Sequence, residues 1–103
     1  MNKIKIEIQH FHGCPNGPKM IDNVRTALKG LEDKTEYCEV LVEDGDTATN
    51  FGFRGSPTLL INGEDFEGLP KPENPGLTCR FYTSGVPSPE KIRKRIIEIS
   101  GNA

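Results

Sequence analysis

Residues 4–31 read IKIEIQHFHGCPNGPKMIDNVRTALKGL and combine a strand with a helix. Isoleucines at positions 4, 6 and 8 alternate with Lys5, Glu7 and Gln9, the period of a strand with one buried face. After a break rich in glycine and proline, apolar residues recur at helical spacing, which predicts an amphipathic helix that stops near Gly30. Cys14 lies where the strand gives way to the helix, and the N-terminal end of a helix favours a thiolate over a thiol.

The composition indicates one small domain over residues 1–103, with a single core. The net charge of −2 gives no basic excess, so we expect no nucleic-acid partner. The N-terminus, MNKIKIEIQ, contains no continuous apolar run, so the sequence predicts neither a membrane partner nor a secretory signal, and we expect a cytoplasmic protein. Three cysteines, an odd number, favour reduced, reactive or metal-bound thiols over a structural disulfide framework.

The remaining pattern predicts an α/β fold with the order strand, helix, strand, helix, strand, strand, helix. Beyond residue 31 we expect elements over residues 35–43, 47–51, 58–61 and 64–67, then a long loop over 68–87 and a final helix from Ser88. The first two strands should be parallel and the last two antiparallel across Asn62-Gly63, giving a mixed four-stranded sheet. The two longer helices should cover the isoleucine face, and the opposite face should be only partly covered.

Cys38 lies within the second predicted strand. No histidine or second cysteine stands at metal-ligand spacing near it, so we interpret it as a small buried hydrophobic residue. The loop over 68–87 is long for so small a domain, and such loops are usually functional.

Two motifs, HGCP after the first strand and TATNFGFRGSPTLLING at residues 47–63, resemble the thioredoxin superfamily. With the order of elements, the resemblance covers roughly residues 3–68 and 88–100. It implies a thioredoxin-like fold with a cis bond before Pro57, which should lie beside Cys14. It also implies that the backbone of Ser56 pairs with extended substrates.

The chain departs from the superfamily pattern at two places. Cys14-Pro15-Asn16-Gly17 lacks the second cysteine of the usual motif, and Ile8 stands where thioredoxins carry a buried acid. The chain also resembles small uncharacterised thioredoxin-like proteins of bacteria and archaea, some labelled alkylmercury-lyase-like. These pair a Gly-Cys-Pro segment with a later Gly-Leu-Ser/Thr-Cys-Arg segment, here residues 76–80. The label does not imply mercury chemistry.

Cys79 is the predicted partner of Cys14. The hairpin returns the chain to the end of the sheet that holds Cys14, so the long loop begins there, whereas Cys38 is fixed within a strand. Arg80 should add positive potential to this site. His10 continues the apolar face of the first strand by alternation, and we interpret it as a satisfied histidine at the sheet edge. For His12 three roles stay open: stabilising the thiolate, binding a metal, or occupying a turn incidentally.

Three functions are compatible with these residues. The first is a thiol–disulfide oxidoreductase in which Cys14 is the nucleophile and Cys79 the resolving cysteine; Ser56, Pro57, His12 and Arg80 would bind a thiol- or disulfide-containing protein or small molecule. It needs no cofactor and no resident metal. The second is a soft-metal protein that uses both cysteines. The third is an interaction module whose open edge at Ser56 and Pro57 binds extended peptides.

Overall fold

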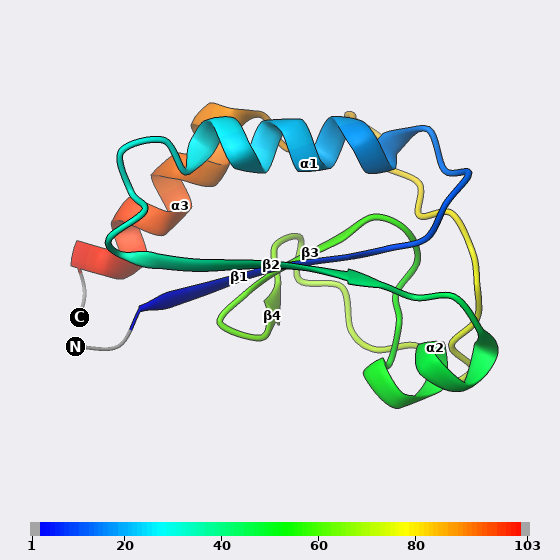
Figure 1. Ribbon diagram of the computed structural model, residues 1–103. Helices are drawn as coiled ribbons and strands as arrows, with labels where there is room; N and C mark the ends of the chain where they lie inside the picture. Colours follow the sequence, from blue (N-terminus) through cyan, green and yellow to red (C-terminus); the bar gives the residue numbers. More distant parts are fainter. Residues whose placement is uncertain (1–2, 102–103) are drawn as a thin grey trace.

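A mixed four-stranded sheet forms the centre of the protein (Figure 1). The computed structural model describes residues 3–101. The strands are β1 (Ile4–His10), β2 (Thr35–Leu41), β3 (Thr58–Ile61) and β4 (Glu64–Asp65), in the order β2-β1-β3-β4. β1 runs parallel to β2 and antiparallel to β3, and β4 returns antiparallel to β3. The predicted strand directions are therefore confirmed, and β1 lies inside the sheet.

Helices α1 (Asn16–Ala27) and α3 (Pro89–Gly101) lie together on one face of the sheet (Figure 1). Their buried residues pack with the alternate isoleucines of β1 in one core. Its side chains with no exposed surface are Ile6, Ile8, Met20, Val24, Ile92 and Ile96. Full burial of each such side chain contributes about 1.5–3 kcal/mol, so this layer dominates the stability of the fold. The predicted placement of both helices is confirmed.

The opposite face is covered at one end only. Helix α2 (Gly45–Phe51) is capped at its N-terminus by Asp44, whose carboxylate accepts a hydrogen bond from the Thr47 amide at 2.7 Å. Its Ala48 packs with buried residues from the flanking segments in a second small core, centred on Phe53. Lys5 on the same face of β1 is exposed, so the cover extends over part of the sheet, as predicted. Between residues 3 and 101, no helix is long and apolar enough to cross a bilayer.

Several boundaries differ from the sequence-based expectation, and α2 begins at Gly45 rather than at residue 47. Helix α1 ends at Ala27 rather than near Gly30, because the Lys29 amide closes a tight turn onto the Thr26 carbonyl. β2 ends at Leu41. The returning strand keeps only two residues, because the carboxylate of Asp65 accepts hydrogen bonds from the amides at positions 67 and 69 and turns the chain out of the sheet.

Candidate functional site

Cys14 and Cys79 form a disulfide across 65 positions of the sequence. Their sulfurs are 2.06 Å apart and their Cα atoms 5.7 Å apart. Cys14 immediately precedes Pro15, the residue that caps the N-terminus of α1, and Cys79 lies in the long loop. The structure thus joins the two cysteines that the sequence pattern predicted as partners.

Residues 78–80, which we call the docked segment, pair with the backbone of Ser56. The Ser56 amide donates to the Thr78 carbonyl at 2.8 Å, and the Arg80 amide donates to the Ser56 carbonyl at 2.8 Å. The peptide bond between Ser56 and Pro57 is cis. The edge that an interaction module would leave open for a peptide is therefore occupied by the protein's own loop.

The side chain of Ser56 contacts the other cysteine-bearing segment. Its hydroxyl oxygen accepts a hydrogen bond from the Phe11 amide at 3.1 Å, three residues before Cys14, and the residue has no exposed surface. Backbone and side chain of one residue therefore hold the segments on both sides of the disulfide.

Gly55 allows the docked segment to approach. Its φ of +106° lies in the region that L residues rarely adopt, and an added Cβ would meet the Cβ of Arg80 at 2.9 Å and its backbone at 3.2 Å. Only a glycine fits between β3 and the docked segment at this point.

Arg80 anchors the docked segment through a buried ion pair with Asp65. Two guanidinium nitrogens donate to the two carboxylate oxygens at 2.6 and 3.0 Å, and a third contact of 3.3 Å reaches the Thr58 hydroxyl. The side chains are 7% and 2% exposed. Burial raises the pKa of Asp65, but hydrogen bonds from Arg80 and from backbone amides outweigh it, so the pKa lies below its usual range.

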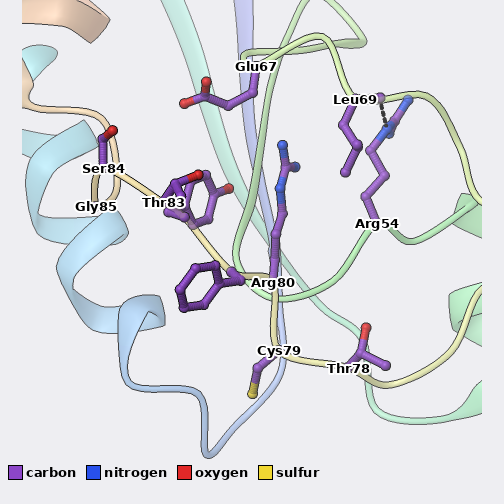
Figure 2. Close-up of a pocket in the computed structure, with 11 residues that line it drawn as sticks. Arg54, Glu67, Leu69, Thr78, Cys79, Arg80, Thr83, Ser84 and Gly85 are labelled. Carbon is purple, nitrogen blue, oxygen red and sulfur yellow. Dashed lines mark hydrogen bonds between the residues drawn. The ribbon is translucent and has the colours of Figure 1, made fainter.

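The charge of Arg80 does not point to the sulfurs. Figure 2 shows the guanidinium and the Cys79 side chain extending in opposite directions from the docked segment. With its charge matched by Asp65, Arg80 serves to fix the position of Cys79 rather than to present a free cation beside Cys14.

Tyr82 adds a second clamp on the same loop. Its hydroxyl donates to the Pro57 carbonyl at 2.6 Å, and the Arg80 guanidinium carbon lies 4.9 Å from its ring centroid. Burial raises the pKa of Tyr82 to about 12, so the phenol stays a proton donor at neutral pH. Sequence reasoning missed Tyr82, Asp65 and Gly55 as site residues, because their roles depend on contacts between distant segments. Gly55 does lie within the motif at residues 47–63, which is the one local signal among the three.

A groove of about 540 Å³ borders Cys14 on the side of α1. Its lining includes apolar residues of the helix start, together with His12, which is exposed. His10 lies at the end of β1, with its Nε2 atom 3.9 Å from a carboxylate oxygen of Glu39. A second hollow, of about 430 Å³, is lined by the loop around Cys79 and Arg80 (Figure 2).

Cys38 is a free thiol and is only partly buried, because β2 is an edge strand and the face opposite the long helices is incompletely covered. The predicted burial of Cys38 is therefore only partial. Its sulfur lies 3.8 Å from a carboxylate oxygen of Glu7. Burial, and then the negative charge of Glu7, raises the pKa of Cys38, which keeps it a thiol.

Histidine, cysteine, aspartate and glutamate side chains do not gather in threes anywhere in residues 3–101 in a way that would hold a metal ion. The candidate site is therefore built around two sulfurs, one at a helix N-terminus and one on a loop beside the residue that precedes a cis-proline.

This sheet order, with a cysteine at the start of the first helix, defines the class of thioredoxin-like proteins. No protein-family model matches the sequence. The chain is 33% identical to a thioredoxin of Methanocaldococcus jannaschii over 76 residues, which cover 71% of this chain and 88% of that protein. The protein belongs to the thioredoxin family, and the predicted thioredoxin-like fold is confirmed.

Replacing Gly55 by alanine should destabilise the protein more than the same change at Gly13. Both glycines have similar φ values, +106° and +101°, so backbone strain of about 1–3 kcal/mol applies to both. Only the Cβ at position 55 would also push against Arg80, since nothing lies within 4 Å of the Cβ position at Gly13. Urea unfolding of both oxidised variants measures the difference. Equal losses of unfolding free energy would show that the docked segment moves aside at no cost and would contradict this prediction.

Asp65→Asn should cost about 3 kcal/mol of unfolding free energy at pH 7, because it leaves the buried Arg80 charge without its partner. The pKa of Asp65 is lower in the folded than in the unfolded protein, so its contribution is present above about pH 4 and is lost as the pH falls through the folded value.

Urea unfolding at pH 7 and pH 3 tests this dependence. The wild type should lose more stability on acidification than Asp65→Asn does, whereas the exposed control Asp33→Asn should follow the wild type. An unchanged acid response in Asp65→Asn would show that the ion pair contributes nothing.

Proposed function

We propose that the protein is a thiol–disulfide oxidoreductase that cycles between a Cys14–Cys79 disulfide and the dithiol. The disulfide between a cysteine at a helix N-terminus and one on an anchored loop is the observation that carries the proposal. Membership of the thioredoxin family agrees with this class of chemistry. The spacing differs from a Cys-X-X-Cys motif, because the second sulfur comes from residue 79 instead of position 17.

In the reduced protein, the Cys14 thiolate attacks one sulfur of a substrate disulfide and displaces the other as a thiolate. Cys79 then attacks the Cys14 sulfur, forms the internal disulfide and releases the substrate as a dithiol. Two electrons pass from the protein to the substrate, and net transfer in the other direction oxidises a substrate dithiol. The direction depends on the reduction potentials of the two pairs.

The substrate is a disulfide- or thiol-containing protein or small molecule. The groove beside Cys14, with His12 at its border, is the proposed place for the groups that flank the substrate disulfide. Ser56 and Pro57 are proposed to contact the substrate, which has to displace the docked segment to pair with the Ser56 backbone. Arg80 acts here by holding the loop.

Cys14→Ser and Cys79→Ser should each reduce catalysed turnover to the uncatalysed rate, because the cycle needs both sulfurs. The assay follows reduction of a protein disulfide with dithiothreitol as the electron source. Cys38→Ser is the matched control and should keep the wild-type rate, since its sulfur lies outside the pair. Wild-type turnover by either of the first two variants would refute the proposal.

In the reduced protein, Cys14 should react with iodoacetamide at lower pH than Cys38. The N-terminus of α1 favours the Cys14 thiolate, and an apparent pKa below the free value of about 8.5 is expected. Burial and Glu7 raise the pKa of Cys38. Labelling at each site, measured by mass spectrometry across a pH series, compares the two within one molecule; an identical pH dependence at both sites contradicts this prediction.

A further inference from the structure

The two cysteines of the disulfide differ in their exposure to solvent. Cys14 is 4% exposed, enclosed between the start of α1 and the docked segment, whereas Cys79 is exposed on the loop. Its neighbours two positions away, Leu77 and Phe81, are 42% and 86% exposed, so the loop presents this stretch to solvent. An attacking thiolate must reach one sulfur along the line of the bond that it breaks, so access decides which sulfur reacts.

We propose that an external thiolate attacks the oxidised protein at Cys79 and that Cys14 is the leaving group. This inference rests on the proposed oxidoreductase function and assigns the roles of the two sulfurs in its reductive half. The sulfur that reacts with the reductant is then the one in the loop, not the one at the helix.

The leaving-group properties of the two cysteines agree with this assignment. Negative charge that develops on Cys14 lies at the N-terminus of the 12-residue α1, where the helix dipole stabilises it. Thiols of lower pKa leave faster in exchange reactions. The nearest cation in sequence to Cys79 is Arg80, whose charge is matched by Asp65 and points away. Cleavage of the disulfide that leaves the thiolate on Cys14 is therefore favoured.

The reaction balances with a thiol reductant. The thiolate forms a bond to the Cys79 sulfur, the bond to Cys14 breaks, and its electron pair stays on Cys14 as a thiolate. A second reductant thiolate then attacks the reductant's sulfur in the mixed disulfide and frees the Cys79 thiolate. The protein gains two electrons, and two reductant thiols become one disulfide.

The docked segment retains other anchors while the mixed disulfide exists. Two backbone hydrogen bonds to Ser56 and the ion pair of Arg80 with Asp65 do not involve the sulfurs. Cys79 therefore stays near Cys14 after the bond opens, with the reductant on the solvent side.

The test uses the oxidised Cys38→Ser protein with glutathione as the probe, so that two cysteines remain. Aliquots are quenched with acid and N-ethylmaleimide at successive times, and peptides are mapped by mass spectrometry. Extrapolated to the earliest times, before glutathione can migrate, we expect it on Cys79 and maleimide on Cys14 in about tenfold excess over the reverse pattern.

Glutathione found on Cys14 in equal or greater amount would overturn the inference. That outcome would leave the proposed function intact, because a disulfide would still open and close. The proposed function fails separately, if mapping of the oxidised protein before glutathione is added shows no Cys14–Cys79 bond.

Discussion

Ser56 is the residue on which the geometry of the site depends. Its hydroxyl oxygen accepts a hydrogen bond from the Phe11 amide, which fixes the segment leading to Cys14. Its backbone amide and carbonyl each make a hydrogen bond with the docked segment, which carries Cys79. The residue is completely buried, so these polar groups have no water to replace a lost partner. Two segments that are distant in sequence thus meet at one residue just before β3, and this brings the two sulfurs together.

The ion pair of Arg80 with Asp65 fixes the position of the long loop, whose many prolines and glycines give it no regular secondary structure. Removal of Asp65 leaves the buried charge of Arg80 uncompensated, which is far more costly than the loss of an exposed pair. The pair of Arg25 with Glu39, whose side chains are 63% and 29% exposed, is of the second kind. The centre of the loop therefore holds its position by electrostatics, where a small domain has little apolar surface to bury.

Local patterns predicted most of the fold. Alternating isoleucines identified β1, and the Asn62-Gly63 turn placed β3 and β4 side by side, because each signal depends on residues adjacent in the chain. The length of β4 was overestimated because the Asp65 carboxylate accepts hydrogen bonds from the amides of residues 67 and 69. The alternation of apolar and polar residues does not reveal such side-chain hydrogen bonds. The orientation of Arg80 was missed for the same reason: its partner is 15 residues away, and only the folded loop brings them together.

The disulfide also converts most of the chain into a covalent ring. Closing a ring across 65 positions removes conformations from the unfolded chain, and in the chain-entropy description this stabilises the folded form by about 4 kcal/mol. Such an increment is a large share of the net stability of a small domain. Reduction of this single bond would therefore lower the stability of the whole fold, including elements that lie far from the two sulfurs.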